Sequence, residues 1–147
     1  MTRILIVYHS QSGNTRIAAD LVAKGALSVE GTDVQVKEGL KATIDDLLNC
    51  DGVAVGSPDY FSYMAGGLKD FFDRTYYPTK GKVTDKPCAI FLTHGGGGRA
   101  VESLKSICRS FKFAPVVEPV LVKEQPDAEV EKRLMSLGKT LAESCEK

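Results

Sequence analysis

Apolar and polar residues form two kinds of pattern that alternate along this chain. One kind predicts strands and the other predicts helices. Continuous apolar runs predict buried strands at 4–8, 53–55, 89–92 and 116–122. A further strand is predicted where apolar and polar residues alternate, at 33–38. Between these segments apolar residues recur every three or four positions, which predicts helices at 15–24, 66–77, 99–113 and 127–146, and a shorter one at 44–48.

Strands without alternation are usually covered on both faces, as in a parallel sheet between helices. Five strand–helix units in 147 residues predict an α/β fold, a doubly wound five-stranded parallel sheet in a three-layer α/β/α arrangement. Because no repeat, low-complexity stretch or linker interrupts the pattern, residues 1–147 are expected to form a single domain. Ligands of such sheets bind beyond the carboxyl ends of the strands, so the residues that follow each strand are the candidates for function.

The loop after the first strand, HSQSGNT (9–15), consists of small polar residues directly before a helix. The start of a helix offers unpaired N–H groups and a partial positive charge, which together favour an anion. Hydroxyls at Ser10, Ser12 and Thr15 and the amide of Asn14 add donors, and Gly13 permits an unusual turn. The loop lacks the lysine found in loops that bind nucleoside triphosphates. It also lacks the G-x-G-x-x-G pattern of dinucleotide-binding folds. It therefore predicts a site for one terminal phosphate, with a simple helix cap as the alternative.

The loop after the third strand, GSPDYFSYMAGG (56–67), carries three aromatic residues, Tyr60, Phe61 and Tyr63, and Pro58 fixes its entry. Aromatic side chains in a loop favour a flat ligand that stacks on them, although they could instead cover the helix below.

The loop after the fourth strand, THGGGG (93–98), has four consecutive glycines, which allow close approach of the backbone and expose peptide N–H groups. The alternative is a flexible turn. His9 and His94 reach the same rim, where a histidine either transfers protons or only forms surface hydrogen bonds. The three loops together predict a ligand with a phosphate at one end and a flat ring system at the other, which is the shape of flavin mononucleotide (FMN).

Composition narrows the function further. The chain has 43% hydrophobic and 26% charged residues and no formal net charge, which argues against a basic nucleic-acid-binding surface. Its first apolar run is too short to span a membrane and no cleavage site follows it, so a cytoplasmic location is expected. Four cysteines without a C-x-x-C pair predict reduced thiols and no metal site.

These motifs resemble those of a known family. SQSGNT (10–15) looks like the phosphate loop of the flavodoxins, and residues 57–75 and HGGGG (94–98) are similar to loops of the flavodoxin-like NAD(P)H:quinone reductases of the WrbA type. The resemblance covers the whole chain and implies the strand order 2-1-3-4-5 with non-covalently bound FMN. It implies a phosphate site at Ser10, Gln11, Ser12, Gly13, Asn14 and Thr15, a ring site at Pro58, Asp59, Tyr60, Phe61 and Ser62, and a pyrimidine border at Thr93, His94, Gly95 and Gly96.

The favoured function is that of a flavodoxin, a low-potential electron-transfer protein with unidentified redox protein partners, no nucleic acid and no membrane. No residue is assigned a catalytic role in this reading. The alternative is an FMN-dependent NAD(P)H:quinone oxidoreductase, in which His94 would donate a proton to the acceptor. A third reading is a binding module that has lost the flavin or holds another phosphate ligand. A monomer or weak homodimer is expected.

Overall fold

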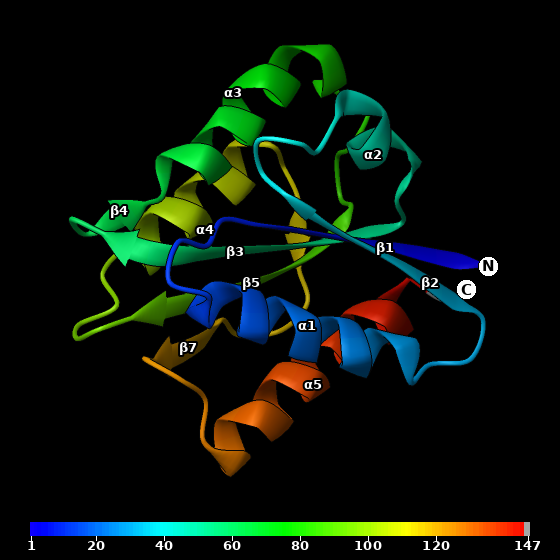
Figure 1. Ribbon diagram of the computed structural model, residues 1–147. Helices are drawn as coiled ribbons and strands as arrows, with labels where there is room; N and C mark the ends of the chain where they lie inside the picture. Colours follow the sequence, from blue (N-terminus) through cyan, green and yellow to red (C-terminus); the bar gives the residue numbers. More distant parts are fainter. Residues whose placement is uncertain (146–147) are drawn as a thin grey trace.

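The strands of the computed structural model, which describes residues 1–145, form one twisted sheet (Figure 1). The sheet order is β2-β1-β3-β5, and two short strands, β6 and β7, both pair with β5 at the edge. All of these pairings are parallel, so the predicted order 2-1-3-4-5 is confirmed with its fifth strand in two pieces. The strands are β1 (Thr2–Tyr8), β2 (Thr32–Glu38), β3 (Gly52–Tyr60), β5 (Pro87–His94), β6 (Ala114–Pro115) and β7 (Val120–Lys123).

The prediction of one continuous strand over 116–122 was wrong. Residues 116–119 separate β6 from β7 and belong to neither strand. Pro115 and Pro119 flank this break, and a proline has no N–H to donate to a strand ladder. An apolar run looks the same in sequence whether or not its backbone is paired, so the pattern of side chains could not show the break.

The helices lie on both faces of the sheet, which confirms the three-layer arrangement (Figure 1). One face is covered by α1 (Asn14–Leu27) and α5 (Ala128–Ser144), and the other by α2 (Ile44–Asn49), α3 (Gly66–Thr79) and α4 (Val101–Ser110). Each face has its own buried apolar cluster. The helix predicted over 127–146 ends at Ser144, and position 146 lies outside the described residues. Within the described part of the chain, no helix has the length and apolar character needed to cross a membrane.

A short antiparallel hairpin extends β3 beyond the sheet and was not predicted. Its second strand, β4 (Tyr63–Met64), pairs with Asp59 and Tyr60. The two residues of the turn, Phe61 and Ser62, both have positive φ, 57° and 64°. Such a two-residue turn usually contains glycine or asparagine, so its sequence carried no hairpin signal.

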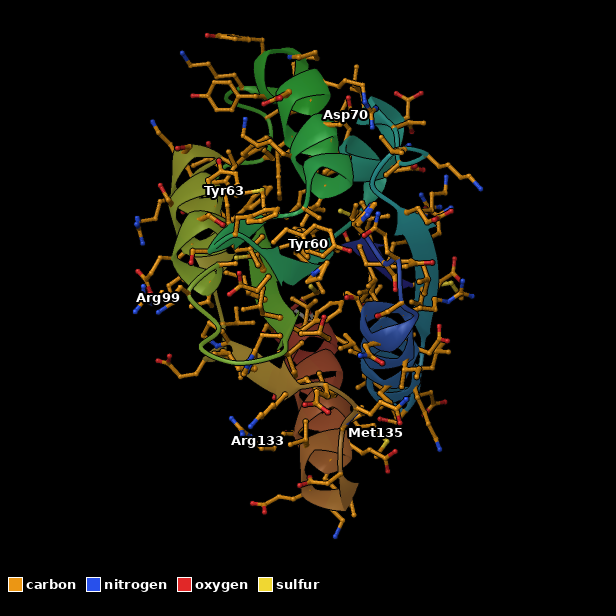
Figure 2. The ribbon with its side chains drawn as sticks, turned by 60° about the vertical axis from the view of Figure 1, so that its left-hand side comes forward. Tyr60, Tyr63, Asp70, Arg99, Arg133 and Met135 are labelled. Atoms are coloured by element: carbon orange, nitrogen blue, oxygen red, sulfur yellow. The ribbon has the colours of Figure 1, made fainter. Side chains whose placement is uncertain are left out.

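Helices α1 and α5 contact each other through their backbones. A Cβ added at Gly25 would lie 1.8 Å from the carbonyl oxygen of Met135, and one at Gly138 would lie 1.9 Å from that of Val22. Any larger residue at either glycine would push the helices apart. Figure 2 shows Met135 on α5, on the side of α1.

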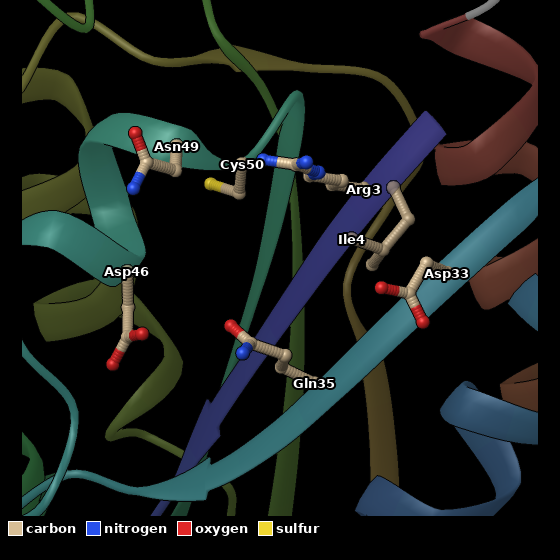
Figure 3. Close-up of a pocket in the computed structure, with 7 residues that line it drawn as sticks. All are labelled: Arg3, Ile4, Asp33, Gln35, Asp46, Asn49 and Cys50. Carbon is tan, nitrogen blue, oxygen red and sulfur yellow. The ribbon is translucent and has the colours of Figure 1, made fainter. Parts of the chain in front are cut away.

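On the opposite face, polar side chains join the elements. The guanidinium of Arg74 on α3 donates to the carbonyl oxygens of Gly39 at 2.6 Å and Ala42 at 3.0 Å, between β2 and α2. The Lys37 ammonium of β2 pairs with the Asp46 carboxylate of α2 at 2.8 Å. Gln35 and Asp46 line a shallow polar pocket of about 210 Å³ between β2 and α2 (Figure 3).

Candidate functional site

The first loop leads from β1 into α1 by a turn at Gly13. Gly13 has φ 100°, its N–H donates to the Ser10 hydroxyl at 3.1 Å, and its carbonyl accepts the first helical bond from Ile17. A Cβ at this position would meet nothing within 4 Å, so its glycine is required by the backbone angle rather than by space. The Ser12 side chain is exposed, and the Ser10 and Asn14 side chains are half-buried. The loop thus brings hydroxyl, amide and helix-start N–H groups to one place, and a phosphate site there stays a prediction.

Thr15 differs from the other residues of this loop because its hydroxyl is buried. Its Oγ1 lies 2.7 Å from Oγ1 of Thr93 at the end of β5, and both residues are almost completely inaccessible to solvent. The pair joins the first loop to the third across the sheet. Thr15 therefore has a structural partner in addition to any ligand.

Tyr60 joins the first loop to the second. Its phenol donates to Oε1 of Gln11 at 2.8 Å, and its ring meets the His9 ring edge-on with centroids 6.1 Å apart. His9 in turn occupies the space that a side chain at Gly67 would need, since a Cβ there would lie 2.3 Å from Nδ1 of His9. Figure 2 shows Tyr60 near the centre of this face. His9, half-buried just after β1, thus packs between Tyr60 and the backbone at Gly67.

Asp59 holds the second and third loops together. One carboxylate oxygen accepts from the backbone N–H of Ser62 at 2.8 Å, and the other accepts from the backbone N–H of Ala100 at 3.2 Å. The first bond stabilises the tight turn at Phe61 and Ser62, and the second fixes the chain that enters α4. The carboxylate is therefore engaged by the protein's own backbone.

Phe61 and Tyr63 project from the hairpin into solvent. The side chain of Phe61 is fully exposed (102% of the reference value), and Tyr63 is 46% exposed. Pro58 is half-buried at the end of β3, and the Ser62 side chain is exposed beside Phe61. The aromatic residues of this loop thus divide into a fixed one, Tyr60, and exposed ones.

The third loop brings His94 and the glycines to the same face. Nδ1 of His94 is buried and has no hydrogen-bond partner among the described residues. Gly95 and Gly96 are exposed, whereas positive φ angles occur at the next two positions, Gly97 at 99° and Gly98 at 68°. A buried polar atom without a partner is costly, so a ligand that supplied a partner to this nitrogen would stabilise the loop.

One buried polar residue beneath these loops was not predicted from the sequence. The hydroxyl of Ser57, completely buried, donates to the Pro58 carbonyl at 2.6 Å and accepts from the Ala65 N–H at 2.8 Å. It closes the base of the hairpin. A single serine between an apolar strand and a proline has no distinctive pattern, and only the tertiary contact reveals its role.

These features fit FMN. Neutral hydroxyl and amide donors at the start of a helix suit a phosphate group. A fixed tyrosine ring, exposed aromatic residues and flexible glycine backbone suit a flat ring, and the unpartnered nitrogen of His94 suits its polar edge. The predicted residues are brought to one face, while their contacts to a ligand stay predictions.

Known proteins resemble the chain along most of its length. The family model described as NADPH-dependent FMN reductase matches residues 2–127. A flavodoxin of Aquifex aeolicus is 34% identical and covers 97% of this chain and 86% of its own length. An NAD(P)H dehydrogenase (quinone) of Acidithiobacillus ferrooxidans is 32% identical, over 65% of this chain and 60% of that enzyme. Among solved structures, an archaeal flavodoxin covers 99% of this chain with a TM-score of 0.89 and 26% identity.

The family match, the relative and the structural neighbour agree with one another and with the three loops. The predicted resemblance to flavodoxins is thereby confirmed, and so is FMN as the cofactor. The chain belongs to the NADPH-dependent FMN reductase and flavodoxin family of FMN-binding proteins.

Proposed function

We propose that this protein carries electrons between redox protein partners through bound FMN, as a low-potential flavodoxin. The observation that carries the proposal is the fully exposed side chain of Phe61 at the tip of the hairpin, with Tyr63 next to it. Exposed aromatic residues at the mouth of a site are suited to contact with another protein. Such a surface serves a carrier, which must exchange partners.

The site residues have distinct tasks in this function. Ser10, Ser12 and Asn14, with the first N–H groups of α1, would hold the phosphate. Burial raises the pKa of the Tyr60 phenol, which stays neutral and keeps its hydrogen bond to Gln11. FMN itself supplies the capacity to accept one or two electrons, and the protein tunes it. Asp59 keeps the two ring-side loops in a fixed relation.

A second candidate is an FMN-dependent NAD(P)H:quinone oxidoreductase. The family model, described as NADPH-dependent FMN reductase, favours it, and so does the unpartnered Nδ1 of His94. In that function His94 would donate a proton to the reduced acceptor. A single domain over 1–147, a cytoplasmic location and a monomer or weak homodimer stay predictions for either function.

An anaerobic reductive titration of the FMN-loaded protein distinguishes the two functions. A carrier is expected to take up electrons in two resolved one-electron steps. It is also expected to oxidise NADH or NADPH with benzoquinone more slowly than about one turnover per second, below typical enzyme rates. A single two-electron step together with turnover above about 10 per second would establish the reductase instead.

The phosphate loop has a matched pair of test variants. Ser12→Ala removes an exposed hydroxyl of the first loop, and we expect about tenfold weaker FMN binding, the value of one hydrogen bond to a charged group. Ser110→Ala removes an exposed hydroxyl at the end of α4 and is expected to leave the affinity unchanged. Equal affinity of both variants, measured by fluorescence titration of apoprotein with FMN, would exclude Ser12 from the phosphate site.

A further inference from the structure

A cavity of about 600 Å³ lies at the edge of the sheet, where the fifth strand is broken. Its walls come from Cys88 to Ile90 of β5, from Lys105, Cys108 and Arg109 of α4, and from Phe113 and the segment 115–119. None of these residues is among those predicted to hold FMN. The cavity is thus a separate feature of the fold.

The break exposes the backbone of β5 to this cavity. The pairing with β6 covers Pro87 and Cys88, and the pairing with β7 begins at Phe91. The carbonyls of Cys88 and His94 accept bonds from Val116 and Glu124 on this outer side. Because alternate residues of a parallel strand face the same neighbour, the N–H of Ile90 also points outward, into the gap between β6 and β7.

The lining combines a mainly apolar surface with a few polar groups. Ile90, Phe113, Val116 and Val117 supply aliphatic and aromatic surface, and Pro115 and Pro119 add to it. A volume of about 600 Å³ falls in the range of pockets that bind small organic molecules. A ligand with a compact apolar body of that size class would match this lining.

The charges of the lining determine what else the occupant carries. Lys105 and Arg109 stand on the α4 wall, and Glu118 stands on the opposite wall, so cations exceed anions by one. Within residues 1–145, Arg109 has no carboxylate within 4.0 Å, and Lys105 has only an exposed contact of 3.5 Å with Glu102. Cationic side chains without a strong partner beside an apolar wall attract an anionic head group.

We propose that this cavity binds a small amphipathic anion, with its apolar body against Ile90, Phe113 and Val117 and its carboxylate or sulfonate directed to Arg109 and Lys105. The N–H of Ile90 is a further donor for a polar atom of the ligand. The proposal does not depend on the identity of the redox partners. It adds a second ligand to a protein whose cofactor lies at the carboxyl ends of the strands.

The test uses the FMN-loaded protein, so that the cofactor site is filled. Methyl and amide NMR spectra are recorded while naphthalene-2-sulfonate is added, and in parallel while the cationic naphthalen-2-ylmethylammonium is added. We expect saturable shifts at Ile90, Val116 and Val117 with the sulfonate, and binding at least tenfold weaker with the cation. The absence of shifts at these residues up to millimolar probe, or equal binding of both probes, would overturn the proposal.

Two variants and one control separate charge from shape. Arg109→Gln is expected to weaken binding of the sulfonate about tenfold, the value of one charged hydrogen bond. Val117→Phe fills part of the cavity and is therefore expected to weaken the binding of both probes. Arg133→Gln removes an exposed arginine of α5 and should change nothing. An unchanged affinity in Arg109→Gln, or shifts that depend on protein concentration without a probe and so report a second copy in the groove, would overturn the proposal.

Discussion

The two helical layers of this protein hold the sheet by different means. On one face, α1 and α5 touch backbone to backbone at Gly25 and Gly138. On the other face, the elements are joined by the side chains of Arg74, Lys37 and Asp46, and α4 borders an open cavity. Both layers pack on buried apolar clusters, but the first adds backbone contacts at glycine and the second adds polar contacts of long side chains.

The difference bears on where function lies. The second and third loops lead into α3 and α4, which belong to the layer joined by side chains. Backbone contacts at glycine cannot accommodate a change of even one methyl group, whereas hydrogen bonds of long side chains adapt to small shifts. The two loops predicted to border the flavin ring are thus attached to the layer that can adjust, whereas the predicted phosphate loop leads into α1 of the other layer.

The largest effect is expected from Gly138→Ala. The added Cβ would lie 1.9 Å from the carbonyl oxygen of Val22, and neither helix backbone can move without moving the layer. We expect a loss of about 3 kcal/mol in the free energy of unfolding, at the upper end of overpacking effects. Urea unfolding measures it. Gly66→Ala on α3, where a Cβ meets nothing within 4 Å, is the control and should change stability by less than about 0.5 kcal/mol. Equal losses of unfolding free energy in Gly138→Ala and Gly66→Ala would show that the contact between α1 and α5 is no tighter than the packing of α3.

An intermediate effect is expected from Arg74→Gln. The variant loses the charged bonds to the carbonyls of Gly39 and Ala42, which join α3 to the chain between β2 and α2. We expect about 1.5 kcal/mol of destabilisation in the same unfolding experiment. Arg133→Gln, an exposed arginine on α5, is the control. A loss below about 0.5 kcal/mol would mean that α3 is held by packing, and would make the two layers alike.

The smallest effect is a dependence on pH at Asp46. Burial alone would raise the pKa of this carboxyl, but hydrogen bonds from Lys37 and Thr43 outweigh it and hold the pKa below the ordinary value of 3.8. The resulting stability is present above pH 3.8 and is lost as the pH falls through the lower folded-state pKa. In Asp46→Asn, stability should fall less steeply with acid below about pH 4 than in the wild type or in Asp45→Asn, an exposed neighbour. If stability fell with pH equally steeply in Asp46→Asn and in the wild type, the Lys37–Asp46 pair would not contribute to acid sensitivity.

Local patterns of apolar and polar residues predicted most of the fold. The run ILIVY, the small polar loop and the amphipathic stretch after it encode β1, the first loop and α1 in consecutive residues. The hairpin at Phe61 and Ser62 was missed because its residues are not those that favour positive φ. The split of the fifth strand was missed because side-chain polarity does not report backbone pairing.

The candidate site was predictable in composition but not in its connections. Residues of the three loops could be named from sequence because each loop follows a strand. The hydroxyl pair of Thr15 and Thr93 and the two bonds of Asp59 join residues that lie far apart in the chain. Such contacts depend on the order of the strands and on the conformation of the loops. A local sequence pattern predicts neither.

The contact between α1 and α5 also has a consequence for synthesis on the ribosome. Gly25 is synthesised 110 residues (135 − 25) before Met135, whose backbone covers it. At about 5–20 residues per second, the first helix waits roughly 10 s with its apolar face uncovered. During that interval the nascent chain is most exposed to chaperones and to aggregation.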